Sequence, residues 1–195
     1  MNGKEFVNRL TEKAYFSYTD AAELEEIKET IEENFDEDGI FMSGFESAAS
    51  IDKRFYDCGD CEELFEEGGV VSLLEEMEPL FDKMGFEAKY VDDSYTGTSH
   101  FITMNDKQYS LSEGSMLMWG ETFVKYADMI NAELALQNKQ ERIYLITYDE
   151  NNYMVFLTQE LYQFVVGQVL VDDAPRTTEE WTKDFFDTMN EFFKQ

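Results

Sequence analysis

The two cysteines of the chain lie three positions apart, in Cys58-Gly59-Asp60-Cys61. A CxxC pair is typical of a redox-active dithiol or of a zinc site. A zinc site needs further nitrogen or sulfur ligands, but these are the only cysteines and His100 is the only histidine. Acidic residues surround the pair, and negative charge raises the pKa of a thiol, the opposite of what a reactive cysteine needs. We therefore expect two ordinary reduced thiols, with no metal and no cofactor.

An oxygen-rich stretch, Asn34-Phe35-Asp36-Glu37-Asp38-Gly39, resembles the first half of a calcium loop. Oxygen ligands stand at alternate positions, and a glycine stands where the loop turns sharply. Such a loop closes on a bidentate glutamate, but Phe45 occupies that position and Glu46 follows one residue late. We expect no high-affinity calcium site here.

The single histidine, His100, falls in an expected strand, where a surface position or a hydrogen-bonded core position is usual. No serine or cysteine forms a recognisable nucleophile motif with it, and the chain has neither a P-loop nor a GxGxxG motif. Acid pairs such as Glu62-Glu63 can in principle transfer protons. Among 43 acids, however, a pair carries little information. We expect no catalytic residues and no enzymatic activity.

Carboxylates dominate the chemistry of the chain, which has a formal net charge of −28 and a pI near 4.1. This self-repulsion opposes compaction and exceeds what solubility needs. The charge is also uneven, because residues 19–93 hold 25 acids against five bases, whereas residues 94–195 hold 16 against seven. Adaptation to high salt spreads acids evenly over a protein, so the clustering of acids in residues 19–93 indicates a binding face. It favours a positively charged protein partner and excludes nucleic acid and anionic membranes as direct partners.

The most acidic stretch runs from Asp20 to Asp38, with ten acids and one base. Leu24, Ile27, Ile31 and Phe35 recur at helical spacing, which predicts one buried stripe and otherwise acidic faces. We expect a helix that begins at a capping box formed by Asp20 and Glu23 and ends before Gly39. At ~1.5 Å per residue it carries one net charge per ~3 Å, near the ~3.4 Å of a single nucleic-acid strand.

Carboxylates along one side of this helix are the candidate partner-binding residues, because a groove lined with Lys and Arg binds carboxylates as it binds phosphates. A second acid run, residues 57–78, contains nine acids and no base. The predicted partner-binding residues are Glu25, Glu29, Glu32, Glu33, Asp36, Glu37, Asp38, Glu62, Glu63, Glu66 and Glu67.

The remaining pattern predicts an α+β fold. Phe6, Val7, Leu10 and Ala14 indicate a short first helix capped by Asn2. Residues 72–84 form an expected helix with a capping box of Ser72 and Glu75. Ser115 opens another helix, on which one apolar stripe is expected: Trp119, Phe123, Ala127, Ile130 and Leu134. Thr158, and Thr177 with Glu180, cap two late helices. Strand signals cover 86–91, a hairpin over 100–111 and a second over 142–157. We expect an antiparallel sheet of two hairpins plus one further strand, packed with helices. The sheet follows an acidic helical lobe, residues 1–68, and residues 69–195 form the core domain, unless the whole chain is one continuous domain.

The leading functional hypothesis is a non-enzymatic inhibitor that mimics nucleic acid and blocks the basic DNA- or RNA-binding groove of a nuclease. Such an inhibitor is of anti-restriction or anti-CRISPR type and of phage or mobile-element origin. The alternative is an acidic immunity protein, an antitoxin or another binding module for a basic protein. No apolar run approaches the ~20 residues of a membrane helix, and the N-terminus lacks the layout of a signal peptide. We therefore expect a cytoplasmic protein.

The incomplete calcium loop yields a first prediction. Millimolar calcium is expected to change the thermal unfolding temperature no more than magnesium does at equal ionic strength. The reason is that Glu46 lies one residue beyond the position of the bidentate glutamate in a calcium loop. Thermal melts followed by circular dichroism measure this. A rise of several degrees with calcium alone would restore the calcium-loop hypothesis.

Overall fold

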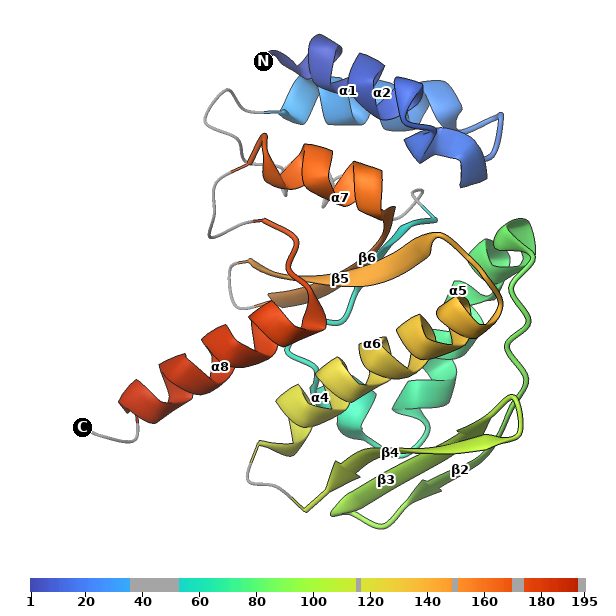
Figure 1. The fold of residues 1–195 in the computed structure, drawn as a ribbon, viewed down its shortest axis with the longest axis vertical. Helices are drawn as coiled ribbons and strands as arrows, with labels where there is room; N and C mark the ends of the chain where they lie inside the picture. The colour runs from blue at the N-terminus through green and yellow to red at the C-terminus, as the bar shows by residue number, and fades with distance from the viewer. Residues whose placement is uncertain (36–52, 115–116, 149–150, 170–173, 193–195) are drawn as a thin grey trace.

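The structure is a computed structural model that describes residues 1–35, 53–114, 117–148, 151–169 and 174–192. Its described helices are α1 (Gly3–Glu12), η1 (Tyr15–Tyr18), α2 (Leu24–Asn34), α4 (Glu62–Phe65), α5 (Gly69–Met84), α6 (Met118–Leu136), α7 (Gln159–Val166) and α8 (Thr178–Phe192). Its described strands are β1 (Phe55–Asp57), β2 (Tyr90–Tyr95), β3 (Ser99–Met104), β4 (Lys107–Glu113), β5 (Glu141–Tyr148) and β6 (Asn151–Thr158). Figure 1 shows their arrangement.

The strands form two antiparallel sheets, which we name sheet A (order β1-β6-β5) and sheet B (order β2-β3-β4). The α+β class is confirmed. The two predicted hairpins are present, but each belongs to its own sheet and each gains one outer strand. The outer strand of sheet A, β1, comes from a segment in which the sequence showed no strand pattern. The strand expected over 86–91 begins instead at Tyr90.

Sheet A is buried on both faces, because successive residues of β5 and β6 point to opposite sides and both sets are apolar. On one face Tyr144, Ile146 and Val155 pack against the N-terminal helices and α7. On the other, Leu145 and Phe156 pack against α5 and α6. In Figure 1 the sheet accordingly lies between an upper helical layer and the α5–α6 layer, with sheet B beyond that.

The N-terminal helices form the upper layer together with α7. The Phe6 ring of α1 stacks on Phe35 at 4.3 Å and on Phe164 at 5.5 Å between centroids. Gly3 permits the close approach of α1 to α2, since a Cβ there would lie 2.1 Å from the Glu32 carbonyl oxygen. Segments 1–68 and 69–195 thus both contribute to the core on each face of sheet A. Their division into two domains stays a prediction.

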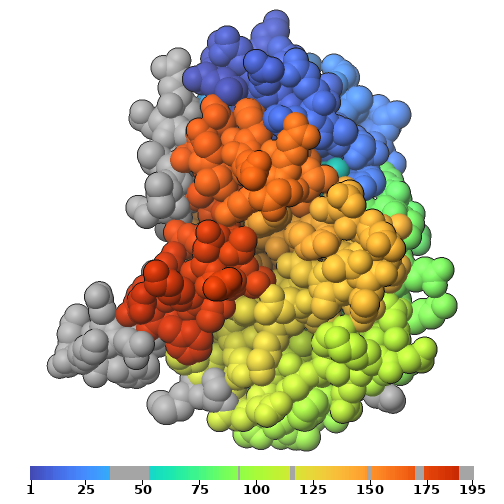
Figure 2. All heavy atoms as spheres, in the orientation of Figure 1, coloured from blue at the N-terminus to red at the C-terminus, as the bar shows by residue number. Residues whose placement is uncertain are grey.

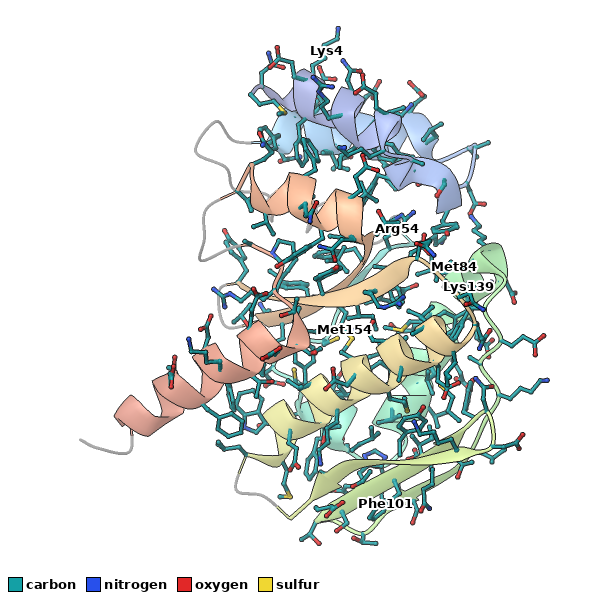
Figure 3. The ribbon with its side chains drawn as sticks, viewed as in Figure 1. Lys4, Arg54, Met84, Phe101, Lys139 and Met154 are labelled. Atoms are coloured by element: carbon teal, nitrogen blue, oxygen red, sulfur yellow. The ribbon has the colours of Figure 1, made fainter. Side chains whose placement is uncertain are left out.

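Arg54 joins the upper layer to sheet A and is only 2% exposed (Figure 3). Its Nε donates to the Tyr15 carbonyl at 2.6 Å and its Nη1 donates to the Phe156 carbonyl at 3.0 Å. Oε1 of Glu141 lies 3.9 Å from Nη1 of Arg54 and also accepts a hydrogen bond from the Tyr18 hydroxyl at 2.7 Å. Burial and this carboxylate raise the pKa of Tyr18 to about 12. A buried cation is therefore matched by carbonyls, a carboxylate and aromatic faces.

Three predicted helix caps are confirmed and two are wrong. Asn2 forms a capping box on α1, Thr158 caps α7, and Thr177 forms a reciprocal pair with Glu180 before α8. Ser72 caps nothing, since α5 begins at Gly69 and the Ser72 hydroxyl donates back to the carbonyl of Gly68.

The other wrong cap is that of Asp20, whose carboxylate binds Lys83 at 2.7 Å instead of capping α2. In both cases the serine or acid lies near a helix start but binds a different group. The helix expected from Ser115 begins at Met118, and Ser115 itself lies outside the described residues.

Sheet B packs against α6, whose predicted stripe is confirmed. Phe123, Ala127, Ile130 and Leu134 are buried, while Trp119 is half-buried at one end. Figure 2 shows α8 lying against α6. Within the part of the chain that the structure describes, no helix is long and apolar enough to cross a membrane.

The buried Arg54 yields a stability prediction. Arg54→Met is expected to lower the free energy of unfolding by about 3–5 kcal/mol, because it leaves the buried carboxylate of Glu141 without its cation. Adding Glu141→Leu should recover part of that loss, since both charges are then gone. Arg9→Met, at a 59% exposed side chain, should cost under about 0.5 kcal/mol. Urea unfolding measures all three; equal losses at Arg54 and Arg9 would contradict the junction role.

Candidate functional site

The predicted orientation of the acidic helix is confirmed for its described part. Glu25, Glu29, Glu32 and Glu33 are exposed on α2. Ile27 and Ile31 are buried in the upper core, while Leu24 and Phe35 pack at its edge. The apolar positions thus fix the rotation of the helix, and the rotation sends the carboxylates to solvent.

The helix is shorter than expected. It runs over Leu24–Asn34, with five acids and one base, and Phe35 already leaves helical geometry. Asp36, Glu37 and Asp38, which the sequence predicted as binding residues, lie outside the described residues, as does most of the calcium-like loop. The site that can be described on this element is therefore the α2 row, by which we mean Glu25, Glu29, Glu32 and Glu33.

The α2 row is almost unneutralised. Glu25 binds Lys28 at 3.4 Å, an exposed pair within the helix. Within the described parts of the chain, no ion pair involves Glu29, Glu32 or Glu33. A row of like charges without partners is electrostatically unfavourable in the isolated protein, so a cationic surface gains the full attraction when it binds.

A second acidic site lies where α4 meets the start of α5. A cleft of about 630 Å³ opens there, and the described residues that line it include no base. Glu63, Glu66 and Glu67 of the predicted set line the cleft, whereas Glu62 is exposed on α4 outside it. The cleft also contains three groups that the sequence did not single out for binding: Asp57, Glu76 and Cys58. In Figure 1, α4 and α5 lie behind α6.

Glycines shape this cleft. Gly68, the residue just before α5, has a φ of +85°, and a Cβ on Gly69 would lie 1.8 Å from the Glu63 carbonyl oxygen. The start of α5 can therefore press against α4 only where side chains are absent. The Gly68-Gly69 pair was the sequence signal for this close approach.

The structure does not bring the two acidic sites into one continuous row. Helix α2 packs mainly on α1, whereas α4 packs on α5 and α6. The ion pair between Lys83 of α5 and Asp20 links the two regions. A partner that engages both sites must therefore span separate elements.

The two cysteines lie among acidic residues, as the sequence indicated. Cys61 is fully buried and Cys58 is half-buried, and both are free. Burial raises the pKa of each thiol above its ordinary value, and nearby carboxylates, Asp57 for Cys58 and Asp60 for Cys61, raise it further. Within the described residues no group of three or more His, Cys, Asp or Glu side chains is arranged to hold a metal.

One constellation escaped the sequence. His100 of β3 is fully buried, its Nε2 bonds to Asp93 of β2, and Ser112 stands opposite it on β4. These residues have the types of a hydrolase triad, but neither the Ser112 hydroxyl nor the His100 Nδ1 has a hydrogen-bond partner among the residues that the structure describes, and both atoms are buried in the interior. The trio is thus a polar pocket of the core, as the hydrogen-bonded histidine reading anticipated. Only strand register could have revealed it.

Exposure of the α2 row makes a prediction about stability. Changing Glu25, Glu29, Glu32 and Glu33 together to glutamine should retain the fold. It should also raise the free energy of unfolding by up to about 1 kcal/mol, because like charges at i, i+4 cost ~0.2–0.5 kcal/mol per pair. Ile27→Gln on the buried face is the control and should destabilise by several kcal/mol. Thermal and urea unfolding compare them; loss of the fold in the quadruple variant would show that the row is structural.

No protein-family model matches this chain, and comparisons with curated proteins and with solved structures likewise give no match.

Proposed function

We propose that this chain is a non-enzymatic protein inhibitor whose acidic surface mimics nucleic acid. Its target is the basic DNA- or RNA-binding groove of a nuclease, and the inhibitor is of anti-restriction or anti-CRISPR type, from a phage or mobile element. The observation that carries the proposal is the α2 row, four exposed carboxylates of which three have no ion pair among the described residues. The proposed place of action is the cytoplasm.

Charge spacing supports the mimicry. The 11 residues of α2 span about 16 Å, and five acids against one base leave about one net charge per ~4 Å. A nucleic-acid strand carries one per ~3.4 Å. Arginine binds carboxylate and phosphate in the same bidentate geometry, so a groove built for phosphates accepts this helix without rearranging its donors.

Rigidity supports it as well. The row is fixed by the burial of Ile27 and Ile31, so its carboxylates are held in register before binding and little backbone entropy is lost on association. The net charge of −28 adds long-range attraction to a basic target, which raises the association rate at low salt. Both effects fit a stoichiometric blocker.

The acidic cleft favours a second candidate, an immunity protein, an antitoxin or another binding module for a basic protein. A concave site of about 630 Å³ accommodates projecting Lys or Arg side chains, whereas a nucleic-acid groove is itself concave and needs a convex inhibitor. This candidate predicts that the cleft acids, and not the α2 row, dominate binding. It also predicts no competition with nucleic acid.

Partner binding tests the proposal. Affinity capture from the host with the native protein as bait identifies the partner, and titrations at rising salt follow. Changing the α2 row to glutamine should weaken binding by several kcal/mol, since each charge-assisted hydrogen bond contributes roughly 1.5–3 kcal/mol. Native affinity should fall steeply with salt, and DNA or RNA should compete for the same site.

A matched control removes the same charge elsewhere. Four other acids are exposed, lie outside α2, α4 and α5, and form no ion pair within the described residues: Asp106, Glu113, Glu179 and Asp187. Their joint change to asparagine or glutamine should leave affinity nearly unchanged. Equal weakening by both variants would mean that only net charge matters. Affinity that is flat with salt, or nucleic acid that binds the partner alongside the inhibitor, would refute mimicry.

A further inference from the structure

The CxxC segment forms a closed turn. The Cys61 amide donates to the Cys58 carbonyl at 2.9 Å, and Gly59 and Cys61 have φ values of +52° and +69°. Such a turn holds its end Cα atoms within about 7 Å, and disulfides span Cα separations of about 4.4–6.8 Å. The backbone is therefore already close to the geometry of a Cys58–Cys61 disulfide.

Asn152 of β6 fixes this turn. Its carbonyl accepts the Cys58 amide at 2.8 Å, and its own amide donates to the Gly59 carbonyl at 2.7 Å. Its side chain donates to that same carbonyl at 3.2 Å and contacts the Cys61 thiol. The turn is anchored to sheet A, so the two thiols keep a defined relation to each other.

The two thiols differ in access. Cys58 lines the acidic cleft, together with Asp57, Glu63, Glu66 and Glu76. Cys61 is fully buried and does not line the cleft. A small molecule therefore reaches Cys58 first, through a passage whose lining residues attract cations and repel anions.

We propose that Cys58 and Cys61 are a redox-active dithiol that exchanges with small, positively charged disulfides drawn into the acidic cleft. The Cys58 thiolate attacks one sulfur of the reagent disulfide, which forms a mixed disulfide and releases one thiol. Cys61 then attacks Cys58 Sγ, which forms the Cys58–Cys61 bond and releases the second thiol. Two electrons pass from the cysteines to the reagent, and the two protons end on its thiols. This site does not depend on the proposed inhibitor function.

Acidic surroundings also set the pH dependence. Because the pKa of both thiols is raised by burial and by neighbouring carboxylates, the reactive thiolate is scarce at neutral pH. Exchange is expected to be slow at pH 7 and to quicken as pH rises toward the thiol pKa.

Reagents of different charge test the proposal on the full chain. Cystamine, 2-hydroxyethyl disulfide and 3,3′-dithiodipropionate are cationic, neutral and anionic, and each is applied at equal concentration at pH 8 and low salt. Mass spectrometry of the intact protein follows the loss of two hydrogens. Cystamine is expected to oxidise the pair at least about tenfold faster than the neutral reagent, and the anionic reagent more slowly still. High salt should reduce the differences in rate among the three reagents, because it screens the charges of the cleft.

Variants separate the steps. Cys61→Ser should stop at a single adduct on Cys58, and Cys58→Ser should leave Cys61 unreacted. Glu63→Gln with Glu66→Gln should reduce the preference for cystamine, whereas Glu113→Gln with Glu179→Gln, which do not line the cleft, should keep it. Equal rates for the three reagents on the native chain, or absence of the intramolecular disulfide with all of them, would overturn the proposal even if a cysteine variant failed to fold.

Discussion

Burial of both faces of sheet A is the constraint on which the rest of the molecule depends. Antiparallel sheets commonly leave one face in water, but in β5 and β6 both alternating sets of side chains are apolar. Two layers must therefore cover the sheet. The α1–α2–α7 layer covers one face and the α5–α6 layer covers the other. Sheet B and α8 then attach to α6, so the order of layers follows from this one sheet.

Arg54 joins the upper layer to sheet A, which requires the burial of a charged side chain between η1 and β6. An unpaired guanidinium in the interior is strongly unfavourable, and here carbonyls of η1 and β6, the carboxylate of Glu141 and the ring of Tyr18 surround it. These partners come from three elements, η1, β5 and β6. The group thus constrains how η1, β5 and β6 are placed around the residue that precedes β1.

The few bases of the chain hold layers together more than they neutralise its acids. Lys13 of the N-terminal layer binds Glu160 of α7 at 2.6 Å, Lys83 binds Asp20, and Lys139 donates to the Met84 carbonyl at 2.9 Å (Figure 3). These contacts join segments far apart in the chain. Apart from the exposed Glu25–Lys28 pair, the α2 row and the acidic cleft have no cationic partner among the described residues, so both remain available to a basic partner or a cationic reagent.

Local patterns in the sequence determined much of this protein. Helical spacing around Ile27 and Ile31 predicted which acids of α2 face water, and hairpin signals located β3–β4 and β5–β6. The caps at Asn2, Thr158 and Thr177 were correct, and each binds a partner three residues on. Tertiary structure decided what depends on distant groups: Asp20 binds Lys83 rather than its own helix, β1 exists because β6 offers an edge, and Ser112 meets His100 through strand register. The acidic cleft belongs to this second class, since it forms only when α4, α5 and the Cys58 turn meet around Gly69.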